Sequence, residues 1–132
     1  MSYANNPTSI LAGQGIAITP TVGTGANTIT ISASGPDILN VRIAVATPDA
    51  ILVTDEVVSI EVPGPVPVAV TLPAGITGRV FNIKDGLGLA SPATPITITP
   101  AAGTIDGAAN AIINTPFGSL TLVYSGTKWL II

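Results

Sequence analysis

The side chains able to do chemistry in this chain are few and of a narrow range of types. Its 132 residues include no histidine and no cysteine. A single chain therefore lacks the residues of Ser-His and Cys-His nucleophilic sites and of ordinary zinc sites. The remaining charged groups are seven carboxylates and four basic residues, Arg42, Arg79, Lys84 and Lys128. Catalytic or metal chemistry would have to rest on carboxylates that converge.

The spacing of the carboxylates does not predict such convergence. Asp55 and Glu56 are adjacent, and adjacent side chains in a strand point to opposite faces, which is wrong for a paired general acid and base. We interpret them as solvated turn residues. A calcium site needs several converging oxygen ligands, of which Asp85, Asp106 and nearby carbonyls supply only a few. The sequence thus predicts no catalytic residue, no metal and no cofactor, and we expect a protein that is not an enzyme.

Asp85 and Asp106 are better explained as turn formers. Each is followed by glycine, Gly86 and Gly107. Aspartate accepts hydrogen bonds from backbone amides two residues on, and glycine adopts a positive φ without steric cost. We therefore expect a tight turn at each Asp-Gly pair.

Trp129 is the single tryptophan, in the last strand-like stretch of the sequence. Tryptophan often serves at interfaces or stacks on sugars. Its apolar neighbours Leu130, Ile131 and Ile132 instead favour burial on both faces of a final strand. The chain has only five aromatic residues, few for a carbohydrate platform, and we expect Trp129 to anchor the core or a subunit junction.

The composition indicates an oligomer. Hydrophobic residues make up 47% of the chain and charged residues only 8%, too few charges to cover the surface of an ordinary monomer. No apolar run approaches the ~20 residues of a membrane-spanning helix, and the aromatic girdles of a membrane barrel are missing. A net charge of −3 without a basic cluster argues against nucleic acid. The lack of cysteine suits a protein folded in a reducing cytoplasm.

The second half of the sequence predicts a compact β unit. Residues 79–86 alternate in polarity and end at a turn, and three more apolar runs, 95–99, 119–124 and 128–132, are bounded by turn formers. Residues 101–113 read as loops with one short strand. The residues expected in the core or at an interface between subunits are Phe81, Ile83, Ile96, Ile98, Leu120, Leu122, Trp129 and Ile131.

The middle of the chain predicts further strands. Residues 38–46 read as one strand, with Leu39, Val41, Ile43 and Val45 on one face and Ile38, Asn40, Arg42 and Ala44 on the other. The mostly apolar second face suggests packing on both sides. Residues 50–54, 57–62 and 68–72 follow as strand candidates. Five prolines between positions 48 and 73 forbid helix and confine strand pairing to edges or bulges.

The N-terminal region predicts an arm and a hairpin. Residues 1–9 are polar and should form an extended arm that clips onto a larger assembly; Tyr3, Asn5, Asn6 and Pro7 are its candidate attachment residues, and a frayed terminus is the alternative. Residues 16–19 and 28–32 alternate with period two around a loop at 20–27. Gly35-Pro36 breaks any strand and marks the predicted domain boundary.

A set of motifs in the second half resembles a small β domain that recurs in virion proteins of tailed bacteriophages. The most telling are Ile-Lys-Asp at 83–85, Thr-Ile-Asp-Gly at 104–107 and the closing Gly-x-x-Trp-x-Ile-Ile at 126–132. The other matching pieces are Leu72-Pro73, Phe81-Asn82, Gly86, Ala90, the Ile-Thr-Ile-Thr-Pro run at 96–100, Gly103, Phe117-Gly118-Ser119 and Leu122. Such domains occur at tail-fibre ends and in head-decoration or head-fibre proteins, and the resemblance implies a structural virion protein that commonly trimerises.

These observations lead to one expectation for the whole chain. We expect an all-β fold, with an arm and hairpin over residues 1–35 for attachment or trimerisation and a β-sandwich or jelly-roll-like domain over 36–132. The expected function is that of a homotrimeric capsid decoration or cement protein, made in the host cytoplasm and located on the virion. Its partners would be itself and the major capsid protein or a tail or fibre protein, with no nucleic acid and no membrane. A tail-fibre or adhesin tip that binds a host-surface glycan is the alternative.

Overall fold

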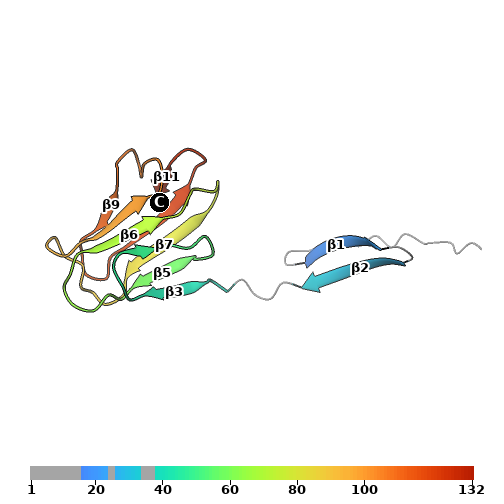
Figure 1. Cartoon of the computed structure of the whole chain (residues 1–132), viewed down its shortest axis with the longest axis horizontal. Helices are drawn as coiled ribbons and strands as arrows, with labels where there is room; N and C mark the ends of the chain where they lie inside the picture. Colours follow the sequence, from blue (N-terminus) through green and yellow to red (C-terminus); the bar gives the residue numbers. More distant parts are fainter. Residues whose placement is uncertain (1–15, 24–25, 34–37) are drawn as a thin grey trace, which may run out of the picture. The chain divides into compact units, whose positions relative to one another are not determined.

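The chain divides into two compact units, Met1–Ile38 and Leu39–Ile132, close to the division predicted after residue 35. The computed structural model in Figure 1 describes residues 16–23, 26–33 and 38–132. The predicted attachment residues Tyr3, Asn5, Asn6 and Pro7 lie outside these described residues.

The first unit contains a two-stranded antiparallel sheet. Strands β1 (Ile16–Gly23) and β2 (Ala26–Ala33) pair from Ile16 opposite Ala33 to Gly23 opposite Ala26. Both strands are longer than the sequence predicted, because the proline-containing stretch expected to be a loop continues β1. Pro20, opposite Ile29, lacks a backbone donor, but a two-stranded sheet leaves one side of each strand unpaired and therefore accepts proline.

The second unit consists of a five-stranded and a four-stranded sheet (Figure 1). The five-stranded sheet has the order β11-β10-β7-β5-β3, and the four-stranded sheet the order β4-β6-β8-β9. The strands of the first are β3 (Val41–Ala44), β5 (Val57–Ile60), β7 (Val80–Asp85), β10 (Ser119–Tyr124) and β11 (Trp129–Ile131). Those of the second are β4 (Asp49–Ala50), β6 (Val68–Leu72), β8 (Ile96–Pro100) and β9 (Ala111–Ile113).

Both sheets are mixed because the chain alternates between them. From β3 to β8 each successive strand belongs to the other sheet, so strands that neighbour each other within a sheet run parallel: β3, β5 and β7 in one, and β4, β6 and β8 in the other. Antiparallel pairing begins at β8 with β9 and continues at β7 with β10 and β10 with β11. None of residues 16–23, 26–33 and 38–132 is helical, and the predicted all-β class is confirmed.

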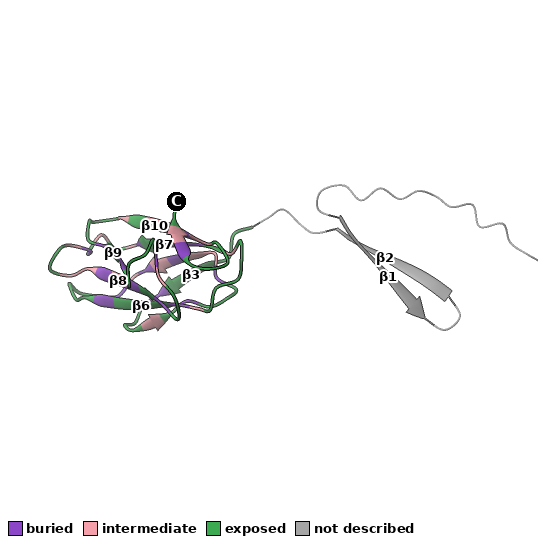
Figure 2. Ribbon diagram, turned by 90° about the horizontal axis from the view of Figure 1, so that it is seen from above, coloured by how far each residue is buried: buried purple, intermediate pink, exposed green. Residues whose placement is uncertain are grey.

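Period-two alternation places one face of each long strand in a shared core. In β6, Val68, Val70 and Leu72 are buried while Ala69 and Thr71 are exposed, the pattern of a strand with one buried face. Buried residues of both sheets belong to one hydrophobic cluster (Figure 2). Its members are Ala44, Ile51, Val58, Ile60, Val62, Val68, Val70, Leu72, Phe81, Ile83, Ala90, Ile96, Ile98, Ile105, Ala111, Ile113, Leu122 and Trp129.

The strand predicted over residues 38–46 is shorter and packs differently. Only Val41–Ala44 form β3, and Val41, Ile43 and Val45 are exposed rather than packed. The prediction of packing on both sides is therefore wrong for the single chain. The strand predicted at residues 50–54 is also wrong in extent, because β4 covers only Asp49–Ala50 and the chain turns before Asp55.

Candidate functional site

The largest exposed apolar feature of strand β3 is a row of four side chains. Leu39, Val41, Ile43 and Val45 alternate along the strand and its two ends, and each is 56–63% exposed. We call these four residues the β3 row. Val41 lies opposite Val57 of β5, and Ile43 opposite Ser59. The next strand on the same face presents Asn82 and Lys84, so the face changes from apolar at its β3 edge to polar in its middle.

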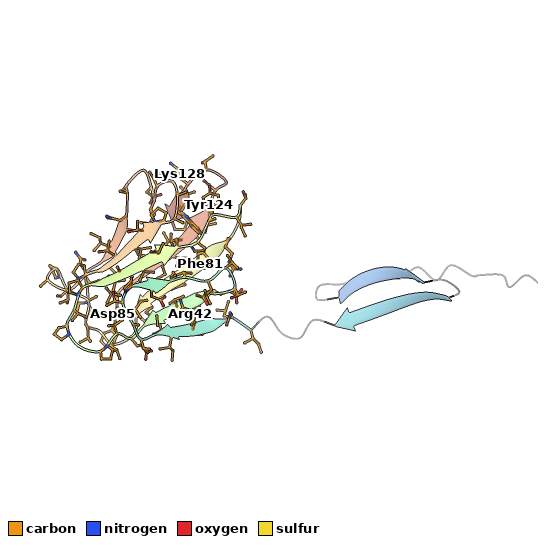
Figure 3. The ribbon with its side chains drawn as sticks, in the orientation of Figure 1. Arg42, Phe81, Asp85, Tyr124 and Lys128 are labelled. Atoms are coloured by element: carbon orange, nitrogen blue, oxygen red, sulfur yellow. The ribbon has the colours of Figure 1, made fainter. Side chains whose placement is uncertain are left out.

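The inward face of β3 carries a charge instead. Arg42 donates two hydrogen bonds to the Asp49 carboxylate, at 3.0 and 2.7 Å, and one from Nε to Asp55 Oδ2 at 2.8 Å. Figure 3 shows Arg42 beside β3. The hydrogen bonds that Arg42 donates to Asp49, opposed by burial and supported by Asp55, raise the pKa of Arg42 further above its ordinary value. We call Arg42, Asp49 and Asp55 the Arg42 cluster. It connects β3, at the edge of one sheet, with β4, at the edge of the other.

Asp55 is buried, which corrects the prediction that it is a solvated turn residue. Its Oδ2 accepts the Arg42 Nε bond and the Leu52 amide at 2.9 Å, and its backbone carbonyl accepts a bond from the Arg79 guanidinium. A buried carboxylate is tolerated only when it is paired in this way. Glu56 is partly exposed and accepts a 2.6 Å bond from the Asn40 amide. The two carboxylates serve structural contacts and do not form an acid and base pair.

Asp85 at the end of β7 is the second buried carboxylate of the described residues (Figure 3). Its Oδ1 accepts the amides of Gly88 and Leu89 at 3.0 and 3.3 Å, and its Oδ2 those of Ala90 and Phe117 at 2.9 and 3.1 Å. Burial alone would raise the pKa of Asp85, but the four amide donors outweigh it and lower the pKa below its ordinary value. The carboxylate thereby holds the loop after β7 against the loop before β10.

The turn at Asp85-Gly86 differs from the prediction. Gly86 has no positive φ, and the amides that Asp85 accepts lie three to five residues on and across the chain rather than two residues on. Gly86 instead leaves room for neighbouring side chains, because a Cβ there would lie 2.2 Å from Ser59 Oγ and that side chain would have to move. The positive φ in this loop belongs to Gly88, at 72°.

The turn at Asp106-Gly107 has both central residues in the left-handed region, with φ of 48° and 86°. Ile105 and Ala108 exchange backbone hydrogen bonds of 2.9 and 2.8 Å around it. These features define a type I′ turn, for which Asp-Gly is a preferred pair. Asp106 Oδ2 also accepts the Ile131 amide at 3.3 Å, which attaches the turn to the last strand.

The residues predicted for the core or a trimer interface fall into two groups. Buried in the core are Phe81, Ile83, Ile96, Ile98, Leu122 and Trp129. Leu120 is partly buried against that core, whereas Ile131 is 40% exposed at the edge of the sheet. Burial on both faces of the last strand is therefore wrong: Trp129 is 1% exposed, but Leu130 is only partly covered.

Phe117 is the exposed aromatic residue that the sequence did not distinguish. It is 59% exposed with φ of 57°, a conformation uncommon for a bulky residue. Asp85 holds its amide, Lys84 Nζ donates to its carbonyl at 2.6 Å, and a Cβ on Gly88 would lie 2.5 Å from its ring. Glycine at 88 therefore permits the ring to lie against the backbone while much of it stays in solvent.

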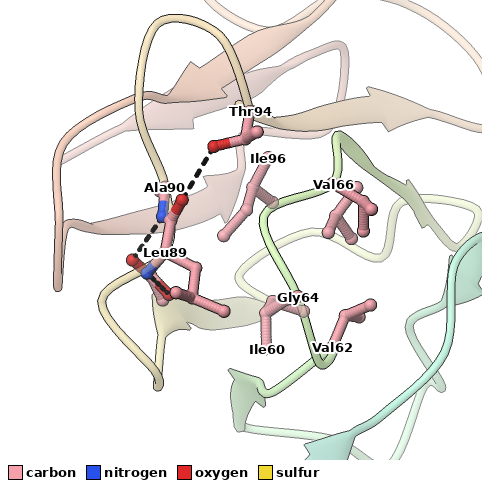
Figure 4. Close-up of a pocket in the computed structure, with 10 residues that line it drawn as sticks. Ile60, Val62, Gly64, Val66, Leu89, Ala90, Thr94 and Ile96 are labelled. Carbon is pink, nitrogen blue, oxygen red and sulfur yellow. Dashed lines mark hydrogen bonds between the residues drawn. The ribbon is translucent and has the colours of Figure 1, made fainter.

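One small pocket lies between the proline-rich loop at 63–67 and the loop after β7 (Figure 4). Its wall is mostly aliphatic and includes Ile60, Val62, Val66 and Leu89, and Thr94 Oγ1 donates a 2.8 Å bond to the Leu89 carbonyl beside it. Its volume of about 10 Å³ suits a single water molecule. A cofactor or an ordinary small ligand needs far more space.

The residues described do not bring together three or more potential metal-ligating side chains. Within the same residues there is no helix of the length and hydropathy that crossing a membrane requires. Neither a scan against protein-family models nor a search of curated proteins finds a match to the chain. Among the described residues the β3 row is the candidate functional surface, because four large apolar side chains lie exposed along one strand and its two ends.

Proposed function

We propose that this chain is a non-enzymatic structural protein of a tailed-bacteriophage virion, a homotrimer that decorates or cements the capsid shell. In this proposal the second unit is a β-sandwich or jelly-roll-like domain. The protein is made in the host cytoplasm, and its partners on the virion are its own copies and the major capsid protein or a tail or fibre protein.

The observation that carries the proposal is the β3 row, an apolar face that residues 38–132 leave exposed, in a chain with only 8% charged residues. A hydrophobic patch of this kind on a soluble protein marks a contact with another macromolecule. The buried carboxylates also support a structural role, since Asp55 and Asp85 are each fully engaged in holding loops or strands. The assignment to a virion is supported by the resemblance of the sequence motifs to those of phage virion domains.

A tail-fibre or adhesin tip that binds a host-surface glycan is the alternative, and Phe117 favours it. An exposed aromatic ring with a fixed backbone suits stacking against a sugar. Trp129 does not serve this role, because its ring is buried. Reconstruction of the virion by electron microscopy separates the two functions: density for this protein on the capsid lattice supports cement, and density only at the tail extremity supports the adhesin.

The purified protein should be a stable trimer. We expect a mass of about 39 kDa by light scattering at micromolar concentration, three times the chain mass of 13.1 kDa. The mass should change little between low and high salt, because association through buried apolar surface is not screened by ions. A mass of about 13 kDa under both conditions contradicts the proposal.

Deleting residues 1–9 should weaken attachment to capsids without dissociating the trimer. The segment contains the predicted attachment residues, and an arm of this composition adds contact rather than core. Co-sedimentation with capsids that lack the protein measures the binding. A variant with the same nine residues in scrambled order is the control for length, and it should also bind weakly. Binding equal to wild type by the deletion variant would show that these residues are not an attachment arm.

A further inference from the structure

We propose that the β3 row is the surface through which copies of this chain meet, with its side chains packed against the same row of the neighbouring copies. The inference rests on the proposed self-association and assigns it to a specific surface. Its occupant is a second copy of the chain.

The first argument is the contrast between the sequence and the packing of β3. In a strand with one buried face, the apolar side chains normally face the core and the polar ones face solvent. Here the inward face holds Ala44 and the Arg42 cluster, while Leu39, Val41, Ile43 and Val45 remain more than half exposed. The β3 row is thus apolar surface that the described part of the chain leaves uncovered.

The second argument is that the β3 row is electrostatically suited to its own copy. A rotation axis places identical side chains close together, so a charge near the axis would face like charges. The single charged residue of β3, Arg42, points inward to Asp49 and Asp55. Two carboxylates near the row are engaged in hydrogen bonds: that of Glu56 accepts the Asn40 amide at 2.6 Å, and that of Glu61 accepts Ser59 Oγ at 2.9 Å. Lys84 lies two strands from Ile43, at about 10 Å by ordinary strand spacing.

The third argument is area. The exposed fractions of the four residues correspond to roughly 400 Å² of surface per chain, as large as the main apolar patch of a typical monomer. Three copies around one axis would gather roughly 1,200 Å² in total, or roughly 400 Å² for each of the three pairwise contacts, so the β3 row would form the apolar centre of a larger interface and not the whole of it. Leu52 and Val53 are exposed as well. They lie in a turn next to the start of β3, because Asn40 Nδ2 donates a 2.7 Å hydrogen bond to the Thr54 carbonyl.

The copies should meet through side chains and not by adding strands. β3 is an edge strand of its sheet, but an inward-pointing charge on an edge strand discourages another strand from pairing with it. Arg42 is such a charge, and its side chain stays one-quarter exposed beside that edge. The outer face of the other sheet is a poorer candidate. Its outward residues in β6 and β8 are small or polar, namely Ala69, Thr71, Thr97 and Thr99, and Ile112 in β9 is its one large exposed aliphatic residue among the described strands.

Ile43→Glu tests the assignment, with Ile112→Glu as its matched control. Both positions are isoleucines on edge strands with similar exposure, 56% and 50%, on the outer faces of different sheets. We expect Ile43→Glu to reduce the mass by light scattering about threefold, to that of one chain, and Ile112→Glu to keep the wild-type mass. Both should retain the wild-type far-ultraviolet circular dichroism, since neither residue belongs to the core.

A cysteine variant keeps the inference testable if Ile43→Glu does not fold. The wild-type chain has no cysteine, so Ile43→Cys and Ile112→Cys each carry one thiol. A short bis-maleimide should cross-link Ile43→Cys chains to each other and leave Ile112→Cys chains largely uncoupled on a denaturing gel. An oligomeric Ile43→Glu protein, or equal cross-linking of the two cysteine variants, overturns the assignment while the proposed trimer stands. A wild-type monomer overturns both.

Discussion

Replacing Trp129 with alanine lowers the free energy of unfolding by about 3–5 kcal/mol, the usual cost of truncating a buried tryptophan. The residue is 1% exposed, and its ring centroid lies 5.5 Å from that of Phe81 and 5.2 Å from that of Tyr124. Its amide donates to the Thr104 carbonyl at 3.0 Å, and its own carbonyl accepts the Asp106 amide at 2.9 Å. The side chain therefore fills the core where the last strand and the 104–107 turn meet.

A thermal melt measures the effect. A change of 1 kcal/mol shifts the melting temperature of a domain of this size by about 4–8 °C, so Trp129→Ala should lower it by more than about 10 °C. The control is Ile131→Ala in the same strand, where 40% of the residue is already exposed and the loss should be much smaller. All variants are compared at equal chain concentration, because oligomerisation contributes to stability.

Trp129→Phe refines the test. The indole Nε1 is buried without a hydrogen-bond partner among the described residues, and an unpaired buried donor is itself unfavourable. Phenylalanine removes that donor and keeps an aromatic ring, so it should be less destabilising than alanine. A Trp129→Ala protein that melts within a degree or two of wild type would contradict burial of the ring and return tryptophan to the list of candidate sugar-stacking residues.

The sequence predicted the all-β class because strand periodicity is a local property. In β6 and β8, and over residues 81–84 of β7, the alternation of large apolar with small or polar residues coincides with the alternation of buried and more exposed side chains. The order of strands was not predictable in this way. The parallel pairing of β3, β5 and β7 arises because the chain visits the other sheet between them, and no local pattern records that path.

The errors concern residues whose environment is set by distant parts of the chain. The adjacent pair Asp55-Glu56 is typical of a solvated turn. Asp55 is instead buried, and its carboxylate accepts a hydrogen bond from Arg42, which lies thirteen residues earlier in the chain. Residues 38–46 carry a fully apolar face, and the sequence cannot distinguish burial of that face within one chain from burial between chains. Phe117 is exposed because Gly88 and Asp85, both remote in sequence, hold its backbone and ring in place.

Replacing Asp85 with asparagine should cost about 3 kcal/mol or more at neutral pH. The carboxylate accepts four backbone amides from two loops, and hydrogen bonds to a charged group contribute about 1.5–3 kcal/mol each before non-additivity is considered. Asparagine has one carbonyl oxygen, so at least two of the four amides lose their acceptor. Asp106→Asn is the matched control: it also precedes glycine, its φ is 48°, and asparagine tolerates that conformation.

The dependence on pH identifies the charge as the cause. The folded-state pKa of Asp85 lies below the ordinary value of 3.8, so its ionised form stabilises the fold above that value, and this contribution is lost as the pH falls through the folded-state pKa. At pH well below 3.8 the wild-type carboxyl is neutral and resembles asparagine. Urea melts from pH 7 down to pH 3 and below should therefore show the difference in unfolding free energy between wild type and Asp85→Asn shrinking as the pH falls. A difference that stays constant over this range would mean that Asp85 acts by its shape and not by its charge.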